Sequence, residues 1–139
     1  MSVAAVLAPV FVQIALTFGL LLWLGAVRLR ALREKELHIR DVERGESRWP
    51  APVTQIQNAY ENQFELPVLF YVLVGLALVA GHATTTLVVL SWLFVVCRLG
   101  HALIHTTTNN VPPRFFAYCA GLAVLMVMWI WFLAVVAFA

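Results

Sequence analysis

Charged residues are scarce in this chain of 139 residues, and they are almost absent from four long stretches of it. Only 12% of the residues are charged and 63% are hydrophobic, whereas soluble domains have about 25% and about 45–50%. The two cysteines, Cys97 and Cys119, lack metal-ligand spacing and the small secreted context of a disulfide framework. Strand-like alternation, internal repeats and low-complexity tracts are missing as well. These absences exclude a soluble domain, a zinc module and a disulfide scaffold.

The charges that are present gather in one segment of the chain. Seven of the nine Lys and Arg residues and five of the seven Asp and Glu residues lie within residues 28–48. A basic segment can indicate nucleic-acid binding, but the signs alternate here, which is typical of a solvated loop. We therefore expect no nucleic-acid partner.

Four apolar runs predict four membrane-spanning helices, at about residues 3–27, 60–80, 85–106 and 115–138. A helix needs about 20 residues to cross about 30 Å of hydrocarbon. The first run is too long to be the apolar core of a signal peptide. It also lacks the positive charge with which a signal peptide starts. The second is too short unless it starts near Tyr60 and takes in Asn62 and Glu65. The third must include Arg98 and His101. We expect an all-α, four-helix membrane bundle forming a single domain over residues 1–139.

The distribution of basic residues predicts how the chain crosses the membrane. Residues 28–59 are expected to form a polar loop, in which residues 32–43 continue the first helix until Gly45, Pro50 and Pro52 end it. Basic residues next to spans stay on the cytoplasmic side. The loop is therefore predicted inside and both termini outside, in a multi-pass membrane protein that would lie in the inner membrane of a bacterium.

The polar residues within the spans share helix faces near the cytoplasmic side. On the third span Arg98, His101 and His105 follow i, i+3, i+7, and on the fourth Arg114 and Tyr118 follow i, i+4. The second span carries one more such face, formed by Asn58, Asn62 and Glu65.

A charge at the bilayer centre costs about 2.5–3.5 kcal/mol on insertion scales, so these groups must face each other or a watery cavity. Glu65 with Arg98 is the first ion pair we expect. An ion-pair network that only joins helices is the simpler alternative, but apolar replacements for such networks are often neutral or stabilising. The excess of positive charge favours a site for an anion instead.

These residues resemble a known family. The run from Asn62 to Pro67, the Arg98-Leu99-Gly100-His101 motif, and Arg114 followed by Tyr118 are similar to the MAPEG family, in a bacterial-type form. That name covers membrane-associated proteins in eicosanoid and glutathione metabolism, including microsomal glutathione transferases and microsomal prostaglandin E synthase. The similarity extends over the four spans and the long polar first loop.

The resemblance implies a homotrimer in membrane lipid that binds glutathione between subunits and acts with it on a lipophilic small molecule, as a transferase, peroxidase or isomerase. Arg114 is implied to be catalytic, by stabilising the glutathione thiolate. A nearby guanidinium favours the thiolate, which is the reactive form of a thiol. The residues implied to hold glutathione are Arg28, Asn62, Glu65, Arg98, His101, His105 and Tyr118, with Arg28 or Arg30 reaching in from a neighbouring subunit.

The chain departs from the family pattern at three positions. His105 stands where the eicosanoid members have Tyr, and Asn58 and Glu61 replace basic residues. These departures leave open a different thiol, or a non-catalytic member that binds lipid or a partner protein. A small transporter with a proton relay through Glu65 and the histidines is a third alternative. It is disfavoured because His82 is the only ionisable residue in the outer half of the spans.

Overall fold

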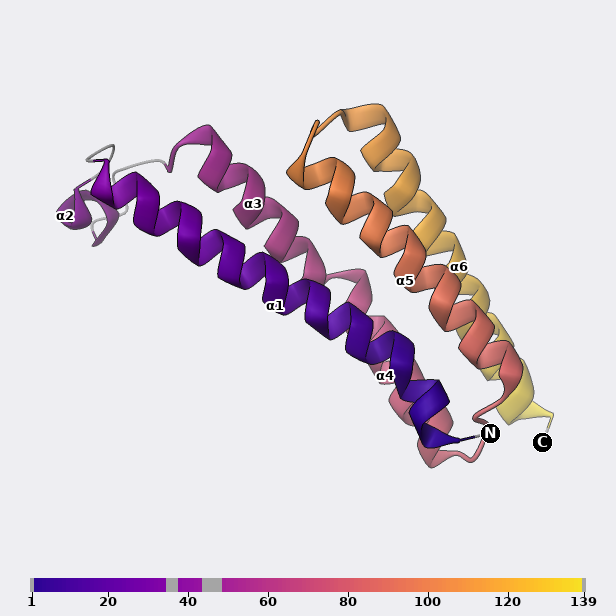
Figure 1. Ribbon diagram of the computed structural model, residues 1–139. Helices are drawn as coiled ribbons and strands as arrows, with labels where there is room; N and C mark the ends of the chain where they lie inside the picture. Colours follow the sequence, from indigo (N-terminus) through magenta and orange to yellow (C-terminus); the bar gives the residue numbers. More distant parts are fainter. Residues whose placement is uncertain (1, 35–37, 44–48, 139) are drawn as a thin grey trace.

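The computed structural model describes residues 2–34, 38–43 and 49–138, and within these ranges every regular element is helical (Figure 1). The elements are α1 (Val3–Arg33), α2 (Ile39–Glu43), α3 (Ala51–Glu61), the 3-10 turn η1 (Asn62–Phe64), α4 (Leu66–Val79), α5 (Thr85–Thr106) and α6 (Val111–Ala137).

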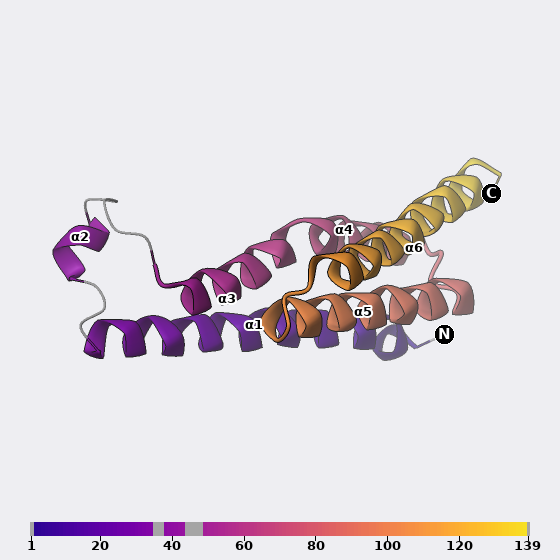
Figure 2. The ribbon, with the colours of Figure 1, turned by 90° about the horizontal axis from the view of Figure 1, so that it is seen from above.

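Four helical segments are long and apolar enough to cross a membrane: α1, the stretch Ala51–Val79 made of α3, η1 and α4, then α5 and α6. The chain is therefore an integral, multi-pass membrane protein, and the expected all-α four-helix bundle is confirmed. Both termini lie at one end of the bundle, and α2 and the connection between α5 and α6 lie toward the other (Figure 1). Seen from above, α1 and α5 form one layer while α3, α4 and α6 form the second (Figure 2).

Local sequence signals set several helix ends. Ser2 caps α1 by accepting a hydrogen bond from the Ala5 backbone N–H, and Thr84 caps α5 in the same way at Leu87. Gly81 has a positive φ of 75°, which lets the chain reverse between α4 and α5. Three of the spans thus begin or end where short polar residues or glycine satisfy the free backbone groups.

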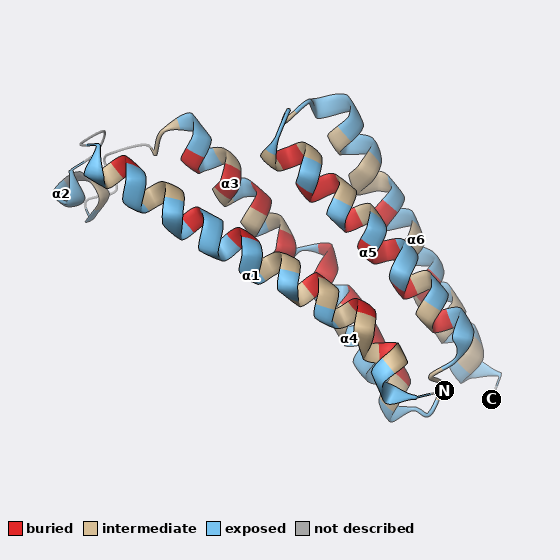
Figure 3. Cartoon of the chain, in the orientation of Figure 1, coloured by how far each residue is buried: buried red, intermediate tan, exposed pale blue. Residues whose placement is uncertain are grey.

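Buried residues recur along the long helices α1, α3, α4, α5 and α6, between exposed ones (Figure 3). In the larger cluster of buried residues, which joins α1, α4, α5 and α6, Phe70 of α4 stacks on Phe94 of α5 with ring centroids 4.7 Å apart. A second cluster joins α1 to α3 through Leu24, Ala31, Val53 and Ile56. The outer faces carry many exposed large apolar side chains, which is the arrangement expected for helices surrounded by lipid.

The second span is interrupted where α3 gives way to α4. Pro67, in the first turn of α4, lacks a backbone N–H and so cannot continue a regular helix. Side chains add hydrogen bonds to the last turn of α3: Asn62 Nδ2 donates to the Asn58 carbonyl and Gln63 Nε2 donates to the Ala59 carbonyl, both at 2.9 Å. Gln13 Nε2 of α1 donates to Gln63 Oε1 at 2.8 Å and ties the break to the first helix. Irregular backbone at membrane depth is tolerated where it is buried in protein, and Gln63 at the centre of this break is buried.

Helix boundaries differ from the sequence-based expectation in the region of the first loop. The helical stretch that contains the second span already begins at Ala51, so α3 occupies part of the expected loop 28–59. Its polar side chains are accommodated by hydrogen bonds, such as that of Gln55 Nε2 to the His105 carbonyl at 2.8 Å. The expected helix over residues 32–43 is divided between α1 and α2, and residues 35–37 and Gly45 lie outside the described residues. The helix α6, which contains the fourth span, begins at Val111, ahead of residue 115, because prolines are accepted in the first turn of a helix.

Candidate active site

A polar cavity of about 270 Å³ opens between η1, the end of α5 and the start of α6. The end of α5 and the start of α6 lie toward the end of the bundle that is opposite the two termini (Figure 1). The residues that line the cavity come from η1 and from the consecutive helices α5 and α6: Asn62, His101, His105, Val111, Arg114, Phe115 and Tyr118. Five of the residues singled out from the sequence therefore share one cavity.

The face of α5 that carries Arg98, His101 and His105 points into the bundle. Arg98 is fully buried, and the two histidines are each 4% exposed. Gly121 of α6 faces this row, where an added Cβ atom would lie 3.8 Å from Arg98 Cδ. The close approach of α6 therefore helps to enclose the guanidinium of Arg98.

Arg98 is held from one side only. Its Nη2 donates a hydrogen bond to the Asn62 carbonyl at 2.8 Å, which links α5 to the interrupted second span. Its Nε and Nη1 are buried and have no hydrogen-bond partner among the described residues. The guanidinium thus has unused donor capacity inside the protein.

The expected ion pair between Glu65 and Arg98 is wrong. Within the part of the chain that the structure describes, the salt bridge found is Arg30 with Glu34, at 2.8 Å on the exposed surface of α1. Glu65 is exposed and instead accepts a hydrogen bond from the Tyr118 hydroxyl at 3.3 Å. The expectation assumed a regular helix through Asn58, Asn62 and Glu65. The backbone of Glu65 (φ −96°, ψ −108°) is not helical, which changes the direction of its side chain.

His101 connects α5 to the start of α6. Its Nδ1 forms a hydrogen bond with the Arg114 carbonyl at 3.1 Å. The histidine nitrogen is the donor in this bond, because a carbonyl oxygen can only accept. Its ring also contacts those of His105 and Tyr118, with centroids 5.6 and 5.7 Å away. The hydrogen bond to His101 therefore holds the backbone of Arg114 beside the cavity.

Arg114 lines the cavity from the first turn of α6, and its guanidinium is oriented by a residue that the sequence analysis did not single out. Arg114 Nη1 donates a short hydrogen bond to the side-chain oxygen of Asn109, in the loop between α5 and α6. The sequence marks Asn109 and Asn110 as turn residues, and the only hint of a further role was their closeness to Arg114.

Arg28 lies apart from the cavity. Its Nη2 donates to Gln57 Oε1 at 3.0 Å, and its guanidinium sits 5.2 Å from the ring centroid of Trp49. The hydrogen bond joins α1 to α3, and the contact with Trp49 has the geometry of a cation–π interaction with the segment just before α3. The glutathione-binding role implied for Arg28 stays a prediction.

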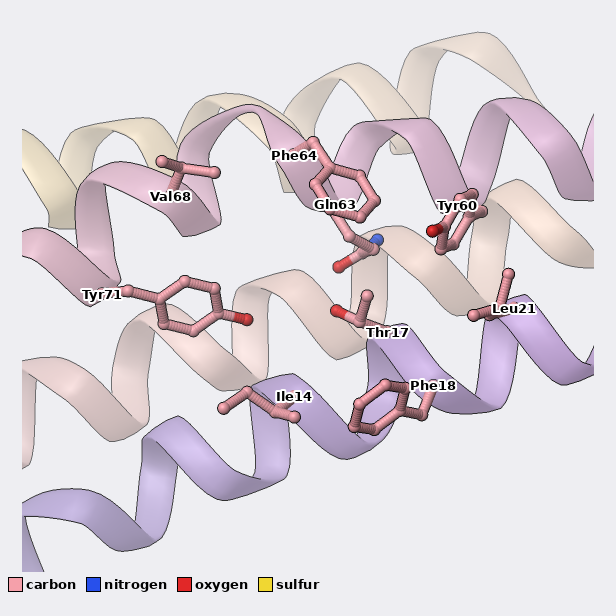
Figure 4. Close-up of a pocket in the computed structure, with 9 residues that line it drawn as sticks. All are labelled: Ile14, Thr17, Phe18, Leu21, Tyr60, Gln63, Phe64, Val68 and Tyr71. Carbon is pink, nitrogen blue, oxygen red and sulfur yellow. The ribbon is translucent and has the colours of Figure 1, made fainter.

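A second, mainly apolar cavity of about 340 Å³ lies on the other side of the helix break, between α1 and the second span (Figure 4). Asn62 and Gln63 are neighbours in the chain, yet they line different cavities. In Figure 4 the hydroxyls of Thr17 and Tyr71 point toward each other from opposite walls, and the remaining lining is largely hydrocarbon. This cavity is suited to a lipophilic group rather than to an anion.

Comparison with known protein families gives a match over most of the chain. The model of the MAPEG family matches residues 6–134, a range that includes every residue lining the two cavities. The resemblance drawn from the sequence motifs is confirmed by this match. No curated protein and no solved structure matches the chain.

Proposed function

This chain belongs to the MAPEG family, and on that basis we propose that it is a membrane transferase, peroxidase or isomerase that uses glutathione, or a similar thiol, on a lipophilic electrophile. Family membership supports a glutathione-related membrane function in general terms. The observation that carries the specific proposal is the guanidinium of Arg114, which lines a polar cavity to which no described carboxylate contributes.

The chemistry of the lining suits an anionic thiol. The cavity offers a guanidinium, a phenol hydroxyl, an amide and two imidazoles. A thiolate is the nucleophilic form of a thiol, and a guanidinium beside it lowers the thiol pKa. In the proposed reaction Arg114 stabilises the sulfur anion, while Asn62, His101, His105 and Tyr118 bind the rest of the molecule. Arg98 positions Asn62 through the hydrogen bond to its carbonyl. Glu65 positions Tyr118 by accepting the hydrogen bond from its hydroxyl.

The proposed second substrate reaches the site from the bilayer. Lipophilic electrophiles concentrate in hydrocarbon, and Phe115 beside the cavity is 63% exposed on the outer face of α6. A site that is polar within and bordered by exposed aromatic surface can bring a charged cosubstrate and a membrane-dissolved substrate together. This arrangement supports the transfer of the sulfur nucleophile to a substrate that never enters water.

We also propose that the working form is a homotrimer, because one chain leaves the site incomplete. The cavity volume of about 270 Å³ is below the range of about 300–1,000 Å³ usual for ligand pockets. Glu65 is exposed although it lies in the middle of the span Ala51–Val79, where a carboxylate facing lipid is costly. A neighbouring subunit packed against this face would enlarge the cavity and cover Glu65.

The decisive test is whether glutathione stabilises the purified protein through Arg114. A ligand that binds only the folded state must raise the melting temperature. We expect glutathione to raise it in the wild type and in Arg33→Gln, a control that removes an exposed arginine from the end of α1. Arg114→Gln should abolish most of the rise and all thiol-dependent turnover.

An analogue of glutathione with serine in place of cysteine separates thiolate binding from binding of the rest of the molecule. The wild type should prefer glutathione, whereas Arg114→Gln should bind both compounds equally weakly. An Arg114→Gln variant that still prefers the thiol would contradict the thiolate role.

The mainly apolar cavity of Figure 4 supports a second candidate function, that of a non-catalytic lipid-binding member of the family. No cationic side chain lines this cavity among the described residues. If glutathione fails to change the melting temperature while a lipid stays bound through purification, this second function is the better one.

A further inference from the structure

We propose that Asn109 is a positioning residue, which holds the guanidinium of Arg114 through an uncharged oxygen and so preserves the positive charge of Arg114 for an anionic ligand. The inference rests on the proposed function for the nature of that anion, glutathione. The contact between Asn109 and Arg114 itself is part of the structure and does not depend on the ligand.

The backbone of Asn109 is specialised for this contact. Among the described residues other than glycine it is the one with a positive φ, 50°, and its N–H donates to the Ile104 carbonyl at 2.8 Å. Asparagine is among the few residues that enter this left-handed region readily. The turn that ends α5 therefore presents the Asn109 side chain to the first turn of α6.

Arg114 is constrained at three points as a result. Its backbone N–H donates to the Asn110 carbonyl at 3.2 Å, and its own carbonyl accepts from His101 Nδ1 at 3.1 Å. Asn109 then orients the guanidinium through Nη1. A side chain fixed in this manner loses little further freedom when it binds a ligand, which favours affinity.

The uncharged acceptor is the important chemical feature. An aspartate in the same place would accept the same hydrogen bond, but it would form an ion pair and compete with the ligand for Arg114. Hydrogen bonds between charged partners are about twice as strong as neutral ones. An amide oxygen occupies one of the five N–H donors of the guanidinium and leaves its charge in place.

Asn109→Asp tests this directly, because the two side chains have nearly the same shape and both accept a positive φ. We expect about tenfold weaker glutathione binding, and a ligand-free melting temperature equal to or above that of the wild type. Asn110→Asp is the matched control: it adds the same charge one residue away, at the exposed N-cap of α6, where Asp is a favoured residue. A merely structural role for Asn109 would instead lower the ligand-free melting temperature and leave glutathione affinity at the value of the control.

Equal glutathione affinity in Asn109→Asp and Asn110→Asp would overturn the inference. If the wild type itself does not bind glutathione, the proposed function fails, and a ligand-free double-mutant cycle between Asn109→Asp and Arg114→Gln decides the inference separately. The substitution Asn109→Asp should then lower the free energy of unfolding more in the Arg114→Gln background than in the wild type. The reason is that the added carboxylate has no guanidinium to pair with once Arg114 is replaced. A cycle with no coupling would show that Asn109 does not hold Arg114.

Discussion

Arg98 combines complete burial with incomplete hydrogen bonding, an unusual state for a side chain that carries a permanent charge. It donates to one backbone carbonyl, that of Asn62, while its Nε and Nη1 have no partner among the described residues. Removing an ion from water costs several kcal/mol, whereas a hydrogen bond from a charged donor returns about 1.5–3 kcal/mol. The balance is unfavourable in the isolated chain, as expected for a residue retained for function rather than for stability.

This balance predicts the effect of replacing Arg98. Arg98→Met keeps much of the side-chain volume and removes the charge, so the ligand-free protein should be at least as stable as the wild type. Arg98→Ala should be less stable by about 2–5 kcal/mol, the usual cost of truncating a large buried side chain. Reversible unfolding in detergent measures both. Loss of stability in Arg98→Met as large as in Arg98→Ala would mean that the charge itself holds the bundle together.

At the scale of the helical element, the break between α3 and α4 organises both cavities. It sends Asn62 to the polar cavity and Gln63 to the mainly apolar one. The break is stabilised from α1, because Gln13 donates to Gln63 in a fully buried hydrogen bond. Side-chain hydrogen bonds between membrane helices contribute about 0.6 kcal/mol on average, with a maximum of about 1.7 kcal/mol.

The two glutamines should therefore be energetically coupled. Gln13→Leu removes one partner and should lower the free energy of unfolding by about 1 kcal/mol. Gln63→Leu should cost more, because it leaves both Gln13 and the Ala59 carbonyl without their partner. The double variant should cost less than the sum of the single ones, as measured by a double-mutant cycle of unfolding in detergent. Simple additivity would indicate that the hydrogen bond does not connect the helices.

At the scale of the whole molecule, the end of α5 and the start of α6, which line the polar cavity, lie toward the same end of the bundle as α2 and the last turns of α1 (Figure 1). These last turns and α2 carry the basic residues Arg28, Arg30, Arg33 and Arg40. The opposite end, with both termini and the turn at Gly81, has almost no charge. Basic residues favour the cytoplasmic side. We therefore propose that the cavity opens toward the cytoplasm, where glutathione would enter it, and that both termini lie outside.

Cysteine labelling tests this orientation, because both ends of the bundle offer exposed threonines. In a background with Cys97 and Cys119 changed to Ala, a membrane-impermeant thiol reagent should label Thr86→Cys in intact cells. Thr108→Cys, at the opposite end, should be labelled only after the cells are opened. The reverse pattern would mean that the protein is inserted the other way round.

The homotrimer predicts a measurable mass. The mass of the protein in mild detergent, after subtraction of the bound detergent, should be three times the 15.5 kDa of one chain. A Glu65→Gln variant should keep this mass, since the amide can still accept the hydrogen bond from Tyr118. A monomer that still binds glutathione with undiminished affinity would show that no neighbouring subunit is needed to complete the site.

The sequence by itself determined the class of the protein, the existence of four spans and the polar face of α5. Hydrocarbon admits few structures, so a long apolar run predicts a membrane helix without knowledge of its neighbours. The helical period likewise placed Arg98, His101 and His105 on one face, and all three are buried there.

Only the tertiary structure decided which partners these groups have. Glu65 does not meet Arg98 because the chain leaves the helical conformation before Pro67, and contacts from α1 and α5 stabilise that break. Asn109 meets Arg114 because a left-handed turn brings a loop side chain against the next helix. Both outcomes depend on backbone conformations outside the regular helical period, which a pattern of residue types along the chain does not specify.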